Sequence, residues 1–297
     1  MFLECKMALL LPLFAFICGL GLASASFSTQ LKILFSSLLA RCFIPFVIIY
    51  NMVFYQAGSL SLMFFSFTVA IFMFYFFRHI FKDKLRALCV SYVNLAWLGF
   101  PFALAIFGSE ISAPMVALYV GGSVFGNIWA VTALNKEQQE LSSIIKKVVL
   151  SPPIFALLIA LIGRMIGVQN LQNHQVLDVL YSFAKVGMSF TGMCVLGMWL
   201  RRTQVQWTDI FRSMNVFAMK VLVGLVLCGL TYLFIPIPNI NQYIGVMFLI
   251  FCLPPAANIV ALETHYLGTG ESARYIAAGT IVSCILVFIY GSILHFV

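Results

Sequence analysis

The chain has 297 residues, of which 63% are hydrophobic and only 9% are charged, and its mean hydropathy is +1.06. Because soluble domains carry about 25% charged residues, this composition excludes an ordinary soluble protein and predicts an all-α polytopic membrane protein. The net charge of +8 does not predict a nucleic-acid partner, since membrane proteins concentrate Lys and Arg in their cytoplasmic loops.

Long apolar runs separated by short polar interruptions predict ten membrane-spanning helices, because about 20 apolar residues are needed to cross a bilayer. In chain order we place them at 7–24, 33–55, 60–80, 87–108, 112–134, 147–168, 177–200, 211–235, 242–266 and 272–295. These spans nearly exhaust the chain, so no sizeable soluble domain is expected.

The first span has an alternative interpretation as a secretory signal peptide. Lys6 precedes its apolar run, and an Ala-Ser-Ala sequence at 23–25 is typical of a cleavage site. Cleavage would leave the new N-terminus outside, whereas the charge pattern requires residues 25–32 to lie inside. Glu4 is also unusual in the leading segment of a signal, so we expect the first span to be retained.

The basic residues are distributed unevenly over the two sides of these spans. One set of alternate connections holds thirteen of the seventeen, namely Lys32, Arg41, Arg78, Lys82, Lys84, Arg86, Lys136, Lys146, Lys147, Arg201, Arg202, Arg212 and Arg274. The opposite side holds only Lys6 and Arg164. This asymmetry predicts a multi-pass protein of the cell membrane with both termini on the non-cytoplasmic side.

Ten spans divide into two sets of five, at 1–134 and 147–297, joined by a short cytoplasmic linker at 135–146. Because five is odd, two homologous halves must face opposite ways across the membrane, which is an inverted repeat. Glycines in the fifth span, including Gly121, Gly122 and Gly126, are expected to allow close helix packing.

Each half is interrupted in its fourth span by helix-breaking residues and an asparagine: Asn94, Gly99 and Pro101 in the first half, and Pro254, Pro255 and Asn258 in the second. Proline lacks an N–H group and breaks or kinks a helix. A kink alone would explain one such span. Two spans at matching positions favour broken helices that line a substrate site, since freed backbone groups cannot face lipid.

Acidic residues are missing from the middle of the fourth and ninth spans, which does not favour a cation as the substrate. Glu263 and Asp178 lie toward span ends, where we expect solvated or interfacial side chains. The lack of acidic residues fits an anionic substrate better than a cationic one, and such an anion would be bound by amide groups and helix dipoles. We expect Asn94 and Asn258 to donate hydrogen bonds to a carboxylate, with Asn127 alongside. The alternative is hydrogen bonding between helices, worth about 0.6 kcal/mol on average.

Two lysines fall within the predicted spans. Lys185 lies about eight residues from the outer end of its span, roughly 12 Å deep at about 1.5 Å per residue. A buried cation in a membrane is a candidate substrate-binding residue, although its long stem could instead reach the interface. Lys220 lies nearer the cytoplasmic end of its span, as does Arg41, and we expect both side chains to snorkel outward.

The reactive residues do not form the pattern of an enzyme or of a metal site. The eight cysteines and four histidines are scattered, without a CxxC pair, so we expect no metal and no cofactor. The sequence contains no HExxH motif, no paired aspartates and no Walker motif, which is evidence against an enzyme or an ATP-driven pump.

Four segments resemble the auxin efflux carrier family. They are FIPFVIIYNMVF at 43–54 in the second span, NLAWLGFPFALAIFG at 94–108 in the fourth, GGSVFGNIWAVT at 121–132 in the fifth, and LPPAANIVALETHYLGTGESARYIAAGTIVS at 253–283 in the ninth and tenth. The resemblance implies two five-helix inverted repeats whose spans four and nine are broken and cross near the bilayer midplane. It also implies a scaffold of spans one, two, six and seven, a moving transport domain, elevator-type alternating access and a homodimer.

The short linker resembles that of bacterial members, whose substrates are more often dicarboxylates or related organic acids than auxin. The chain is therefore expected to carry a small organic anion. A bile-acid/sodium-symporter-like carrier has the same ten-span design and is the alternative. That class would be expected to show a carboxylate-rich sodium site, which the sequence does not provide.

Overall fold

The computed structural model describes residues 2–54, 58–134, 142, 146, 149–171, 175–201, 203–267 and 269–296. These residues are mainly helical, with a single isolated β-bridge between Val93 and Pro255. Most of the predicted linker at 135–146 lies outside the described residues. The fold class of an all-α protein is confirmed for the described part of the chain.

Six helical stretches are long and apolar enough to cross a membrane: Ser28–Val53, Ser59–Phe81, Ser109–Trp129, Gln175–Leu200, Trp207–Phe234 and Ser272–Leu294. They confirm a membrane protein with several spanning helices. The other four predicted spans contain shorter apolar helices, at Leu11–Leu22, Leu95–Phe107, Pro152–Met165 and Ile240–Cys252. The count of ten spans therefore stays a prediction.

The helices divide into two compact units by their contacts. The first unit contains residues 1–59, 96–116 and 149–202, and the second contains 60–95, 117–148 and 203–297. Predicted spans one, two, six and seven fall in the first unit, and spans three, eight, nine and ten fall in the second. Spans four and five contribute to both. The units are defined by spatial contacts, so they differ from the sequence halves at 1–134 and 147–297. The division of the sequence into these two halves stays a prediction.

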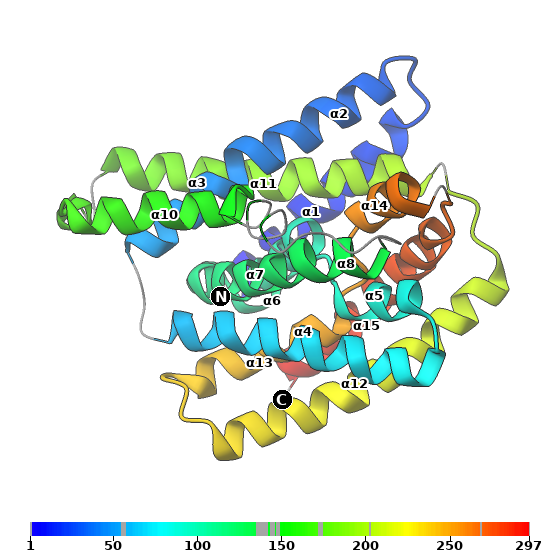
Figure 1. Cartoon of the computed structure of the whole chain (residues 1–297). Coiled ribbons are helices and arrows are strands. Elements are labelled where there is room, and N and C mark those ends of the chain that lie inside the picture. Colours follow the sequence, from blue (N-terminus) through cyan, green and yellow to red (C-terminus); the bar gives the residue numbers. More distant parts are fainter. Residues whose placement is uncertain are drawn as a thin grey trace. The chain divides into compact units, whose positions relative to one another are not determined.

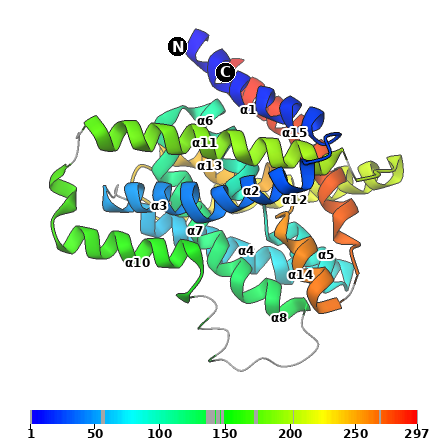
Figure 2. The same ribbon diagram turned by 90° about the horizontal axis from the view of Figure 1, so that it is seen from above.

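The first unit contains three long helical segments, at Phe2–Leu22, Ser28–Val53 and Gln175–Leu200. Its helices are α1 (Phe2–Leu22), α2 (Ser28–Leu38), η1 (Leu39–Phe43), α3 (Ile44–Val53), most of η2 (Leu95–Gly99), α6 (Phe100–Phe107), η3 (Ser109–Ile111), the start of α7 (Ser112–Phe125), α10 (Pro152–Met165), η5 (Val168–Leu171) and α11 (Gln175–Leu200). Helix α3 lies between α10 and α11, and α1 packs along α11 (Figure 2).

Glycines bring the backbones of α1 and α11 into direct contact. A Cβ atom added at Gly19 would lie 2.1 Å from the carbonyl oxygen of Cys194, and one added at Gly197 would lie 2.3 Å from that of Phe16. Small residues allow this close approach of two membrane helices, whose association depends on van der Waals packing.

Gly19→Ala is therefore expected to lower the melting temperature of the detergent-solubilised protein. The added methyl group meets a backbone atom that cannot move aside, and overpacking of this kind costs about 1–3 kcal/mol. Gly21→Ala, on the same helix, is the control, because nothing lies within 4 Å of a Cβ atom there. Equal melting temperatures for the two variants would contradict this close contact.

The second unit contains α4 (Ser59–Phe81), α5 (Lys84–Ser91), the rest of α7, η4 (Gly126–Ala130), α8 (Val131–Leu134), α12 (Trp207–Phe234), α13 (Ile240–Cys252), α14 (Asn258–Leu267) and α15 (Ser272–Phe296). Helices α12 and α13 form a hairpin joined at residues 235–239, and α15 packs against both (Figure 1). These packed helices surround the candidate site.

The predicted role of glycine in the fifth span is confirmed. A Cβ atom at Gly121 would lie 2.1 Å from the carbonyl oxygen of Met63, so α7 and α4 touch through their backbones. A Cβ atom at Gly126 would lie 2.2 Å from the ring of Tyr92. The second contact matters for the site, because it brings η4 against Tyr92, the first residue after α5.

Candidate functional site

Two helices of the second unit end where the sequence predicts interruptions. Helix α5 ends at Ser91 and α13 ends at Cys252, and helical structure resumes only with η2 at Leu95 and with α14 at Asn258. The chain is extended or irregular between these points. Both segments are therefore broken, and not merely kinked.

The two breaks pair with each other as a short antiparallel crossover. Val93 lies opposite Pro255. The backbone N–H of Asn94 donates to the carbonyl of Pro254 at 2.8 Å, and that of Ala256 donates to the carbonyl of Tyr92 at 2.8 Å. We call residues 92–95 and 253–258 the crossover.

The two prolines end the helix, and they are also compatible with the hydrogen bonds of the crossover. Pro255 occupies the position of an antiparallel pair that exchanges no hydrogen bond, so its missing N–H leaves no acceptor unpaired. Pro254 contributes only its carbonyl, which accepts from Asn94. The same residues that cannot continue α13 can therefore form the bridge.

Side chains from two other helices bind the carbonyl groups freed at the end of α13. Ser283 Oγ on α15 donates to the carbonyl of Cys252 at 2.6 Å, and Lys220 Nζ on α12 donates to that of Leu253 at 2.6 Å. Backbone groups that lose their helical partners inside a membrane must be satisfied within the protein. These two bonds meet that requirement.

The expectation that Lys220 snorkels to the interface is wrong. Its side chain is only 2% exposed, because the carbonyl of Leu253 offers an acceptor within reach inside the unit. The sequence did place a lysine within a span, but the acceptor comes from a residue 33 positions away. Arg41 is exposed.

The structure brings two of the predicted asparagines to the crossover. Asn94 is 6% exposed and belongs to the bridge through its backbone. Asn258 is the first residue of α14, is exposed, and donates from Nδ2 to the hydroxyl of Tyr92 at 3.0 Å. Asn127 is partly buried in η4, next to Gly126, which packs against the ring of Tyr92.

The other predicted site residues lie in the first unit. Gly99 is the last residue of η2 and Pro101 is the second residue of α6, so both follow the break at residues 92–94. Pro101 does not cause that break, because a missing N–H is tolerated in the first turn of a helix. Lys185 lies on α11, with its ammonium 4.6 Å from the ring centroid of Tyr181.

The expectation of a solvated carboxylate is wrong for Glu263, whereas its depth relative to the membrane interface stays a prediction. It is fully buried, and it accepts hydrogen bonds from Thr269 Oγ1 at 2.6 Å, from the backbone N–H of Glu271 at 2.7 Å, and from both the N–H and the hydroxyl of Ser272. These donors surround the first turn of α15, where a negative charge is stabilised by the helix dipole. Asp178, in the first unit, is partly buried and accepts from the hydroxyl of Tyr50 at 2.7 Å.

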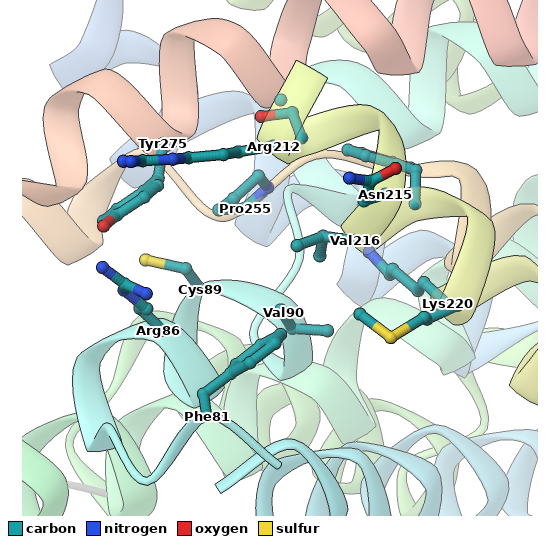
Figure 3. Close-up of a pocket in the computed structure, with 14 residues that line it drawn as sticks. Phe81, Arg86, Cys89, Val90, Arg212, Asn215, Val216, Lys220, Pro255 and Tyr275 are labelled. Carbon is teal, nitrogen blue, oxygen red and sulfur yellow. The ribbon is translucent and has the colours of Figure 1, made fainter. Parts of the chain in front are cut away.

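A cavity of about 350 Å³ reaches the crossover from the side of α5, α12 and α15 (Figure 3). Its lining includes Pro255 and three basic side chains, Arg86, Arg212 and Lys220, and the described lining contains no carboxylate. In Figure 3 both guanidinium groups lie on the same side of the cavity as Tyr275, and Lys220 lies on the opposite side. The guanidinium carbon of Arg86 is 5.5 Å from the ring centroid of Tyr275.

Sequence reasoning assigned Arg86 and Arg212 to cytoplasmic connections and did not foresee the cavity. Both side chains are exposed, and Arg86 Nε lies 3.3 Å from the carboxylate of Asp83 in an exposed pair. A concave surface lined by charges of one sign concentrates ions of the other sign. The cavity can therefore attract an anion toward the crossover.

No metal-binding cluster accompanies these cations. Among the described residues, no group of three or more His, Cys, Asp or Glu side chains could hold a metal ion. No protein-family model matches the chain, and no curated protein matches it. The functional interpretation therefore depends on the crossover and on the basic cavity.

Proposed function

We propose that the protein is a secondary carrier that moves a small organic anion across the cell membrane. The observation that supports this proposal is the antiparallel crossover of two broken helices beside a cavity lined by three cations. Paired interrupted segments, with half-helix ends near a substrate site, are the usual design of secondary transporters. The positive lining favours an anion as the substrate.

In this proposal the anion binds at the crossover through amide donors and the N-terminal end of α14. Asn258 is the first residue of that helix and has an exposed side chain. Helix N-termini and amide N–H groups stabilise carboxylates. Asn94 contributes from the opposite strand, and Arg86 and Arg212 attract the anion from the cytoplasmic side.

The architecture that we propose for this carrier has ten spans arranged as two inverted repeats, with both termini outside the cytoplasm. It moves its site by an elevator-type shift and works as a homodimer, as the resemblance to auxin efflux carriers implies. The substrate class is a carboxylate or dicarboxylate, and the protein has no enzymatic activity.

The proposal is tested by uptake of labelled acetate, benzoate, succinate and malate into proteoliposomes, with and without a pH gradient. The reconstituted protein is expected to transport at least one of these acids, in competition with unlabelled acid. If none of these acids is transported and sodium binds in the crossover, the bile-acid/sodium-symporter-like alternative replaces this function.

Asn258→Ala is expected to raise the KM for the transported acid about tenfold, because a hydrogen bond to a charged group contributes about 1.5–3 kcal/mol. Asn170→Ala is the matched control, since Asn170 is an exposed residue of η5 in the first unit. An unchanged KM for Asn258→Ala would exclude this side chain from the substrate site.

A further inference from the structure

Lys220 places a positive charge against the end of a half-helix in the second unit. Its ammonium is 2.6 Å from the carbonyl oxygen of Leu253, one residue after α13 ends at Cys252. The side chain is 2% exposed. The other described cations of the cavity, Arg86 and Arg212, lie on the side opposite Lys220 in Figure 3.

This position is one at which a cation is favourable. The C-terminal end of a helix carries a partial negative charge. In carriers with broken helices, such ends and the unwound carbonyl groups beside them coordinate sodium ions or protons. Here the carbonyl of Leu253 already binds an ammonium group that belongs to the chain, and that of Cys252 is bound by Ser283.

The ammonium has donors left for another ligand. A lysine ammonium has three N–H donors, and one of them serves Leu253. Lys220 lines the cavity of about 350 Å³. It also lines a second cavity of about 10 Å³ beside Tyr92 and Leu95, on the other strand of the crossover. The charge is thus present at the crossover itself.

We propose that Lys220 is a tethered counter-cation of the substrate site: its ammonium occupies the place of a coupling cation at the end of α13 and balances the charge of the bound organic anion. Transport then requires no sodium ion. This inference rests on the proposed function and deepens it, because it assigns the charge balance of the same site.

The test separates the charge of Lys220 from its hydrogen bond. Lys220→Gln keeps an N–H donor but carries no charge, whereas Lys220→Met and Lys220→Ala remove both the charge and the donor. Uptake of labelled succinate and benzoate is measured in proteoliposomes with sodium, potassium or choline as the external cation. Lys146→Met is the control, because Lys146 is exposed in the same unit.

We expect the native protein to transport equally in the three salts. Lys220→Gln is expected to lose about tenfold or more in kcat/KM, because its anion loses a charged partner, with a melting temperature near that of the native protein. In Lys220→Ala, ethylammonium in the buffer is expected to restore part of the uptake, since it supplies the missing cation.

Two results would overturn this role, namely normal uptake by Lys220→Gln or a strict sodium requirement of the native protein. The second result needs no variant, so it decides the question even if the substituted chains do not fold. If the native protein transports no organic anion in any salt, the proposed function fails together with this role. Normal uptake by Lys220→Gln removes the role of Lys220 alone.

Discussion

Replacing Pro254 and Pro255 together by alanine is expected to lower anion uptake about a hundredfold or more, because a single proline already disfavours a helix interior by about 3 kcal/mol and the double variant removes this barrier to a continuous helix. With two N–H groups restored, α13 can continue through residues 253–257 into α14. A continuous helix removes the bridge between Val93 and Pro255 and the hydrogen bonds that flank it. The measurement is the initial uptake rate in proteoliposomes at equal protein content.

The matched control is the double replacement of Pro236 and Pro238, two exposed prolines in the connection between α12 and α13. It removes the same number of proline rings without touching the crossover, so its uptake should stay near the native rate. Native uptake by the Pro254→Ala, Pro255→Ala protein would show that the helix break has no part in transport.

Replacing Arg86 and Arg212 together by alanine is expected to reduce kcat/KM about a hundredfold at low ionic strength, because electrostatic attraction in a charged cleft raises association rates by about 10–1,000-fold. Both residues line the cavity. The loss should shrink at about 1 M salt, where the screening length falls to about 3 Å and the native protein also loses its attraction for the anion.

Arg78→Ala is the control for this pair, since Arg78 is an exposed residue near the end of α4. Its kcat/KM should match that of the native protein at every salt concentration. A salt-independent loss in the double variant would mean that the arginines act on the fold and not on the approach of the anion.

The prolines of the ninth span predict where that span breaks. The sequence does not predict where the fourth span breaks. Pro254 and Pro255 cannot continue a helix wherever they lie. In the fourth span, Pro101 marked the wrong place, and the chain leaves α5 at Tyr92, where no proline occurs. The reason is tertiary, because residues 92–94 exchange backbone hydrogen bonds with residues 254–256.

The charged residues show the same limit. Lys220 and Glu263 were recognised as ionisable residues of the spans, but their surroundings depend on distant partners. Lys220 on α12 donates to the carbonyl of Leu253, the first residue after α13. Glu263 finds the hydroxyl and backbone donors at the start of α15. Composition and periodicity predict that a side chain lies within a span, but not which acceptor or donor it meets.

Three consecutive carbonyl groups at the break are held from three separate parts of the second unit. The carbonyl of Cys252 is bound from α15, that of Leu253 from α12, and that of Pro254 from the strand that follows α5. A displacement of any one of these segments would strain the bonds to the other two. In the elevator-type shift that we propose, the break is therefore expected to move together with α5, α12, α13 and α15, because these bonds join them.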